Sequence, residues 1–175
     1  REILLPGIEI NFKKFKSFIK YLKESDFEII SIDELNNIIS KGVIPNRKQI
    51  VLTFDDGYID NYKIVYPYLS ELQIPFTIYV CNGLINKSIY IWWYLILNLY
   101  DLQKKTLTIN GEQFKLKTSN KSKIFNFLRC QDEKSLKSLL LNLEIDINES
   151  YKLFNEEISM TWDQISELSK SKYVT

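Results

Sequence analysis

Two adjacent carboxylates, Asp55 and Asp56, stand between an apolar run and Gly57. Adjacent carboxylates can divide the work of a hydrolytic site, because one can hold a divalent cation while the other takes a proton from water. A lone Asp-Asp-Gly is also a common surface turn, since these residue types favour turns. The apolar run that leads directly into the pair favours the functional interpretation.

The run from Ile50 to Phe54 is short, apolar and β-branched, which is typical of a buried strand in a parallel sheet. Neighbouring strand residues point to opposite faces, so the two carboxylates diverge unless the chain turns after them. Gly57 permits that turn, because it tolerates backbone angles that a Cβ forbids. The pair is therefore predicted at the carboxyl end of a strand, where α/β folds place their chemistry. Asp60 is predicted to cap the helix that follows.

Helix and strand patterns alternate around this motif. Helices are predicted from Asn11, from the capping box Ser31–Glu34 as far as Gly42, and as a fresh turn at Pro67. Further strands are predicted at Glu28–Ser31 and Phe76–Cys81. Strands that alternate with helices imply parallel pairing through right-handed crossovers. The fold class predicted for the chain is therefore α/β.

The alternation of predicted helices and strands ends after Gly83. An apolar stretch predicts a buried helix, alternation around Asn110-Gly111 predicts a β-hairpin with a type I′ turn, and two or three helices follow. We interpret residues 88–158 as an insertion within a single domain, because the segment lacks the composition of a linker. A second capping box at Thr161–Gln164 then leads a helix, and Lys172–Thr175 is predicted to begin another strand.

Composition excludes several classes of function. The 175 residues are 45% hydrophobic and carry a net charge of +1, which gives enough apolar surface for a core and no field that favours nucleic acid. The most apolar stretch is too short to cross a bilayer, and no signal peptide is visible. The two cysteines, Cys81 and Cys130, have no metal-ligand spacing, and no disulfide can be deduced from them.

The acidic motif and its flanks resemble the polysaccharide deacetylase family, the NodB-type domain. The resemblance covers about Phe12 to Gly83 and returns at Met160 to Thr175; it rests on Val51–Tyr58, Asp60-Asn61-Tyr62, Tyr66-Pro67 and Ile74–Thr77. It implies a partial (β/α) barrel, an N-acetylated polysaccharide or oligosaccharide as substrate, and a bacterial envelope or secreted location. It also implies that Asp55 is the general base and Asp56 the metal ligand.

The same resemblance implies a divalent metal, zinc above all, held by one carboxylate and two histidines. The chain contains no histidine. The segment from Thr161 to Thr175 is similar to the approach to the family's histidine motif, so the chain is expected to be the N-terminal part of a deacetylase domain. A closed barrel typically needs about 250 residues, which agrees. Weak metal binding or none is expected from Asp56 in this chain alone.

Two aromatic residues are candidates for substrate binding. Tyr58 adjoins the carboxylates and is predicted to line a groove or to pack beside it. Trp92 resembles tryptophans that family members carry at this point; it is a candidate sugar-stacking platform, with core packing as the alternative. Two other functions remain open for the chain. One is a non-catalytic carbohydrate-binding or scaffolding protein on the same fold. The other is a magnesium phosphatase. It is disfavoured because the acidic motif of such phosphatases separates its two aspartates by one residue, whereas Asp55 and Asp56 are adjacent.

Overall fold

The structure is a computed structural model that describes residues 10–89, 93, 106–109, 112–115, 121–132, 134–136, 138 and 158–175. The chain divides into two compact units, one formed by Arg1–Asn86 with Ile158–Thr175 and the other by Lys87–Glu157. The acidic motif belongs to the first unit. Within the described residues, no helix has the length and apolar character to cross a membrane.

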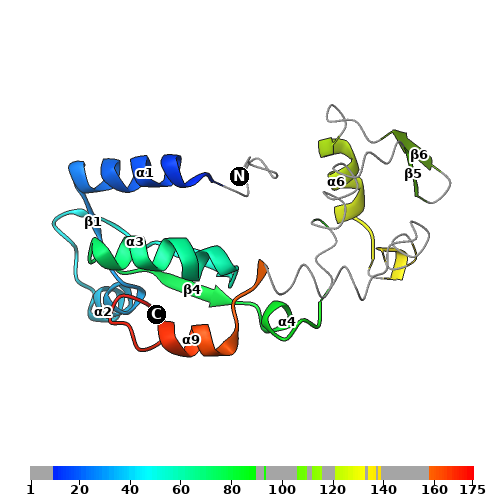
Figure 1. Ribbon diagram of the computed structural model, residues 1–175. Coiled ribbons are helices and arrows are strands. Elements are labelled where there is room, and N and C mark those ends of the chain that lie inside the picture. Colours follow the sequence, from blue (N-terminus) through cyan, green and yellow to red (C-terminus); the bar gives the residue numbers. More distant parts are fainter. Residues whose placement is uncertain are drawn as a thin grey trace. The chain divides into compact units, whose positions relative to one another are not determined.

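Helices and strands alternate in the first unit, which confirms the mixed α/β prediction (Figure 1). In chain order its elements are α1 (Phe12–Glu24), β1 (Phe27–Ile29), α2 (Ile32–Lys41), β2 (Lys48–Ile50), β3 (Thr53–Asp56), the π-helix η1 (Asn61–Val65), α3 (Tyr66–Glu71), β4 (Thr77–Val80), α4 (Asn82–Ile85) and α9 (Trp162–Leu168).

The strands pair in parallel, as the alternation predicts. β1 pairs with β2, and β3 pairs with β4. The end of the chain continues this arrangement, because Phe76 donates its N–H to Tyr173 O at 2.9 Å and accepts from Thr175 N at 3.1 Å. Phe76 and Val174 form an isolated parallel bridge, so the strand expected at Lys172–Thr175 is present as a short pairing. These short ladders do not by themselves show the predicted partial barrel.

The prediction of one strand over Ile50–Phe54 is wrong in its bounds. β2 ends at Ile50 and β3 begins at Thr53, with two residues between them. The physical reason is a change of partner: Ile50 O accepts from Ile30 N at 2.9 Å, whereas Leu52 O accepts from Thr77 N at 2.9 Å. The carboxylates therefore form the last two positions of β3 and do not follow it.

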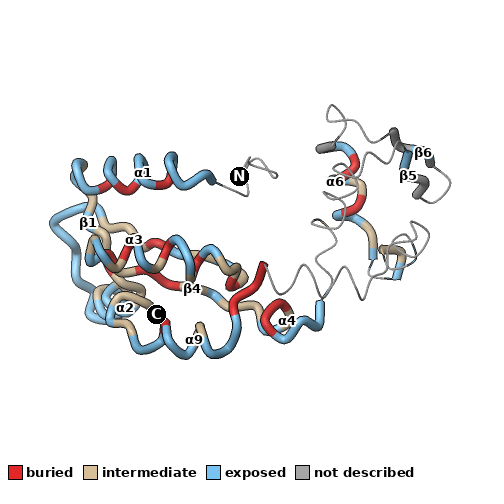
Figure 2. Tube along the Cα trace, viewed as in Figure 1, coloured by how far each residue is buried: buried red, intermediate tan, exposed pale blue. Residues whose placement is uncertain are grey.

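One face of these strands forms the core. Its side chains pack with α1 and α3 in a cluster whose buried members are Phe15, Ile19, Leu22, Leu52, Val65, Leu69, Ile74 and Phe76. Figure 2 shows the buried residues of α1 along one side of the helix. The alternate residues Thr53, Asp55 and Tyr79 are exposed, Tyr79 to 53%. The β3–β4 pair thus has one apolar face that helices cover, and these three exposed residues lie on its other face, beside the buried Thr77.

The predicted caps at Ser31 and Thr161 are confirmed, and Asn11, where a helix is predicted to begin, also caps its helix. Asn11 Oδ1 accepts from Lys14 N at 2.8 Å and Ser31 Oγ accepts from Glu34 N at 3.1 Å. Thr161 and Gln164 form the complete capping box at the start of α9. The prediction that Asp60 caps a helix is wrong. The helix begins before Asp60, so the backbone of Asp60 is already helical and its side chain makes no capping hydrogen bond.

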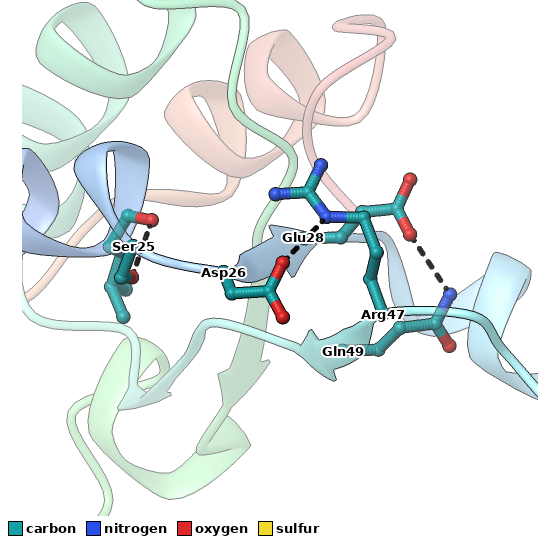
Figure 3. A network of polar contacts seen from close by, with 6 residues as sticks. Ser25, Asp26, Glu28, Arg47 and Gln49 are labelled. Carbon is teal, nitrogen blue, oxygen red and sulfur yellow. Dashed lines mark hydrogen bonds and ion pairs between the residues drawn. The ribbon is translucent and has the colours of Figure 1, made fainter.

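The amino ends of β1 and β2 are joined by polar contacts (Figure 3). Arg47 lies 3.4 Å from Asp26, and Gln49 donates to Glu28 at 3.3 Å. All four side chains are exposed or partly so, so each contact is worth at most about 1 kcal/mol. Their effect is to fix the register of the two strands, at the end away from the carboxylates.

The second unit contains the predicted hairpin. β5 (Thr106–Ile109) and β6 (Glu112–Lys115) pair antiparallel, with Ile109 opposite Glu112. The turn residues at 110–111 and most of the predicted helix over 89–102 lie outside the described residues. Helix α6 (Lys121–Arg129) buries Ile124 and Leu128, as the sequence pattern predicts. That residues 88–158 are an insertion remains a prediction.

Candidate active site

The candidate site is built on the acidic turn, by which we mean residues Asp55–Tyr58. Asp56 has φ 69° and Gly57 has φ 81°, so two successive residues take left-handed backbone angles. Gly57 was expected to make the turn and does so. Asp56 takes its positive φ at a steric cost of about 1–2 kcal/mol, because a Cβ crowds the backbone there. Strain of this kind is concentrated at functional sites.

All four carbonyl groups of the acidic turn accept hydrogen bonds. Gly57 N donates to Asp55 O at 2.9 Å, and Cys81 N at the end of β4 donates to Asp56 O at 3.1 Å. Two further bonds go to Gly57 O from Met160 N and to Tyr58 O from Asn61 N, both at 3.0 Å. Three separate segments thus hold the turn, which fixes the backbone that carries both carboxylates.

Gly57 is enclosed by apolar side chains from three segments. A Cβ at this position would lie 3.2 Å from Ile85 Cδ1 and 3.5 Å from both Met160 Cε and Val80 Cγ1. Glycine is therefore favoured at this position by its backbone angle, and a Cβ would require the neighbouring side chains to shift by a few tenths of an ångström.

A cavity of about 400 Å³ opens beside the acidic turn. This volume is in the range of small-molecule sites, about 300–1,000 Å³. Its polar lining comes from the carboxyl end of β3 and the start of the following helix, and its apolar lining comes from α1, β3 and η1. The lining residues include Asp55, Asp56, Tyr58, Asp60, Asn61, Phe12, Phe15, Phe54 and Ile64.

Aromatic rings build the apolar wall of this cavity. Phe15 packs edge-on against Phe54, with ring centroids 6.0 Å apart, and Phe12 packs edge-on against Tyr68 at 5.3 Å. Edge-to-face pairs of this kind are favourable because the positive ring edge meets the negative face. The wall is therefore held by the core and is not a loose surface feature.

Asn61 is a further residue of the site; the sequence motif includes it without giving it a role there. It is 5% exposed, lines the cavity, and points its Nδ2 at Asp55 O over 3.5 Å. Its carbonyl accepts from Tyr66 N, five residues further along, which is the hydrogen bond that defines a π-helical turn. π-Turns occur often at functional sites. Pro67 follows at the start of α3; it lacks an N–H, so its position beside the irregular turn was the available sequence signal.

The structure brings together three of the four predicted site residues. Asp55 is exposed, and Asp56 and Tyr58 are half-buried; all three line the cavity. Tyr58 also forms an antiparallel bridge with Ser159. Trp92 lies outside the described residues. Among the residues that the structure describes, no group of three or more His, Cys, Asp or Glu side chains could hold a metal ion.

A second tie connects this region to α9. Tyr62 donates its hydroxyl to Glu167 Oε2 at 2.7 Å across 105 residues of sequence. This hydrogen bond raises the pKa of Tyr62 above its ordinary value of 10.0, because the neutral phenol is the donor. The helix that follows the acidic turn is thereby linked to the C-terminal helix.

The model of the polysaccharide deacetylase family matches residues 42–173. YxkH of Bacillus subtilis, whose name places it among polysaccharide deacetylases, is 32% identical over 83 residues, 47% of this chain and 28% of the relative. The poly-β-1,6-N-acetyl-D-glucosamine N-deacetylase of Staphylococcus aureus (strain MSSA476) is 27% identical over 84 residues, 48% of this chain and 29% of the relative. The matched region thus spans under a third of these relatives.

Solved structures show the same fold at low identity. The BpsB deacetylase domain of Bordetella bronchiseptica superposes with a TM-score of 0.51 at 15% identity, covering 97% of this chain and 44% of that one. A de-N-acetylase of Aggregatibacter actinomycetemcomitans gives a TM-score of 0.50 at 15% identity, covering 99% of this chain and 48% of that one. The chain is therefore similar in fold to these deacetylase structures and matches less than half of each solved chain.

Proposed function

The chain belongs to the polysaccharide deacetylase family, and on this premise we propose that its acidic turn supplies the carboxylates of a site that removes N-acetyl groups from a glycan. The observation that carries the proposal is the position of Asp55 and Asp56 at the end of β3, beside a cavity of about 400 Å³. The carboxyl ends of parallel strands are where α/β folds bind ligands.

We assign different roles to the two carboxylates. Asp55 is exposed and lines the cavity at the carboxyl end of β3. This position suits a general base, which would take a proton from the water molecule that attacks the acetyl carbonyl. Asp56 is half-buried, and its left-handed backbone turns it away from the regular alternation of β3. That position suits a fixed ligand for a divalent cation, the role that the family resemblance implies.

The described residues do not complete a zinc site. A catalytic zinc usually has three protein ligands besides water, and no group of three candidate side chains gathers among the described residues. The chain also supplies no imidazole, because its sequence contains no histidine. A metal at this site would need ligands beyond those that the described residues bring together, so we assign no chemical step to a metal. Asp55 and Asp56 remain the groups that this chain contributes.

The architecture is proposed to be an arc of a (β/α) barrel interrupted by an insertion at residues 88–158. The parallel strands with helices on one face support the arc. The side chain of Trp162 donates to Asn86 Oδ1 at 2.8 Å, so the two ends of the intervening segment meet. An insertion whose ends meet leaves the surrounding fold continuous, which supports its assignment as an insertion.

The substrate class is proposed from the relatives and from the cavity lining. The S. aureus relative is named for β-1,6-linked poly-N-acetylglucosamine, and we extend N-acetylated glycans of this chemistry to the present chain. Tyr58 lines the cavity beside the carboxylates, where its ring and hydroxyl would contact a sugar. Trp92 keeps its proposed role as a stacking residue.

Acetate release tests the proposal. Residues 1–175 alone are expected to release none from N-acetylglucosamine polymers with any added divalent metal. A chimaera in which the chain continues into the corresponding C-terminal segment of YxkH is expected to be active. Activity of the unextended chain would contradict the ligand argument. A well-folded but inactive chimaera, with the YxkH parent active, would contradict the proposed role of the acidic turn.

The second candidate function is a non-catalytic glycan-binding protein. Two observations favour it: the sequence contains no histidine, and the cavity beside the acidic turn is nevertheless present. It predicts that the chain binds N-acetylated oligosaccharides and that the inactive chimaera still binds them. The enzyme proposal requires turnover, so the same acetate assay separates the two functions.

A further inference from the structure

We infer that Trp162 is a preorganised platform on which a sugar ring of the glycan stacks, next to the acidic turn. The inference deepens the proposed function and rests on it. Trp162 is the first residue of α9, and 49% of its surface is exposed. Tryptophan is highly buried on average, so a half-exposed indole calls for a physical explanation.

The indole is held in one orientation. Its Nε1 donates to Asn86 Oδ1 at 2.8 Å, just past the end of α4. Water would satisfy the same N–H almost equally well, so this bond adds little stability and mainly fixes the ring. A fixed ring has less freedom to lose when a ligand binds, which is how preorganisation raises affinity.

The backbone beneath the indole is also fixed. Thr161 Oγ1 accepts from Gln164 N at 3.3 Å, and Gln164 Oε1 accepts from Thr161 N at 2.9 Å, which closes the capping box around Trp162. Ring and backbone are therefore both held at the start of α9.

The backbone of the platform is linked to the acidic turn by one hydrogen bond and two peptide units. Met160, two residues before Trp162, donates its N–H to Gly57 O at 3.0 Å. Consecutive Cα atoms are about 3.8 Å apart, so the Cα of Trp162 lies within about 8 Å of that of Met160. Gly57 directly follows Asp56, which places the indole within the reach of a short oligosaccharide bound at the acidic turn.

The chemistry of the occupant follows from the ring. The negative face of an indole attracts the positively polarised C–H groups on one side of a pyranose ring, while the hydroxyls point away to water. An N-acetylated glycan that enters the proposed site would thus find an apolar, oriented surface for a neighbouring sugar. The platform would contribute to affinity and chain position, and not to the chemical step.

The test titrates the 175-residue chain with a tetramer of β-1,6-linked N-acetylglucosamine and follows the indole N–H resonances by NMR. The Trp162 resonance is expected to shift and saturate. Trp162→Ala is expected to weaken binding about tenfold or more, as loss of an aromatic anchor does. Trp162→Leu, which keeps apolar bulk without an aromatic face, should weaken it similarly, and Asn86→Ala should weaken it less by freeing the ring.

Tyr21→Ala is the matched control, because Tyr21 is an aromatic residue of α1 that is 59% exposed and lines no part of the cavity. It is expected to bind as the unaltered chain does. Equal binding by Trp162→Leu and the unaltered chain would overturn the platform and leave the proposed function standing. No binding by the unaltered chain at millimolar tetramer would overturn the platform and also count against a glycan as the ligand.

Discussion

Replacing Gly57 by alanine tests whether the acidic turn depends on glycine in the way the structure indicates. Gly57 has φ 81°, and an added Cβ would lie 3.2 Å from Ile85 Cδ1. Gly42 offers a matched control within the same unit. It ends α2 with φ 61° and has nothing within 4 Å of its Cβ position. The two substitutions share the backbone penalty, and Gly57→Ala alone adds crowding.

The magnitudes follow from these two contributions. A left-handed angle at a residue with a Cβ costs about 1–2 kcal/mol, which is the whole effect expected for Gly42→Ala. Forcing a methyl group into a packed environment typically costs about 1–3 kcal/mol more. Gly57→Ala should therefore lower the free energy of unfolding by about 2–5 kcal/mol. The excess over Gly42→Ala measures how tightly Ile85 and its neighbours enclose the turn.

Urea unfolding of both variants gives the two free energies, and hydrogen exchange locates the damage. Gly57→Ala should speed exchange at Met160, whose N–H donates to Gly57 O, and at Cys81, whose N–H donates to Asp56 O. Gly42→Ala should leave both amides unchanged. If the two variants lose equal stability, or if exchange at Met160 does not change, the turn is not enclosed as described.

Three further predictions use the same first unit. The pKa of Tyr62 is raised because its hydroxyl donates a hydrogen bond to Glu167. This hydrogen bond therefore stabilises the fold fully below the ordinary pKa of 10.0, and the stabilisation disappears as the pH rises through the raised pKa. Tyr62→Phe should remove this pH dependence from thermal unfolding curves. In the active chimaera, Asp55→Asn should lower the rate of acetate release by about 10²–10⁴-fold and keep the metal affinity. Asp56→Ala should lose metal binding. Calorimetry with the metal and an acetate-release assay on both variants would test this division of roles. Deleting 104–156 with a short linker should leave the parallel pairs intact by NMR; loss of the β3–β4 pairing would contradict the proposed insertion.

Local signals predicted much of the first unit. The caps at Ser31 and Thr161 follow from side chains that reach only three residues along the chain, so no knowledge of tertiary structure is needed. The parallel pairing follows from the alternation of helices and strands. The positions of Asp55 and Asp56 at the end of a strand follow from an apolar run that stops at two charges.

The errors arise where a distant partner decides the local structure. The break between β2 and β3 comes from a change of hydrogen-bonding partner from β1 to β4, which leaves no mark in an apolar run. The π-turn at Asn61 and the absent cap at Asp60 come from a helix that starts earlier than the acidic residue suggests. α2 shows the same limit: its apolar pattern is regular, yet Ile39 is 68% exposed, because periodicity does not reveal what covers a face.

The hydrogen bonds of the acidic turn bear directly on what this chain contributes to a site. A strained residue persists only where its surroundings over-determine it. Asp56 O accepts a hydrogen bond from Cys81 N just after β4, and the next two carbonyls, of Gly57 and Tyr58, accept from the segment before α9 and from the π-helix. A surface turn would need none of these, because water would satisfy its carbonyls. The fold therefore concentrates restraint on the backbone of two carboxylates and leaves Asp55 exposed to the cavity. Restraint at a charged, accessible pair is the property that a general base and a metal ligand require, whichever polypeptide supplies the remaining groups.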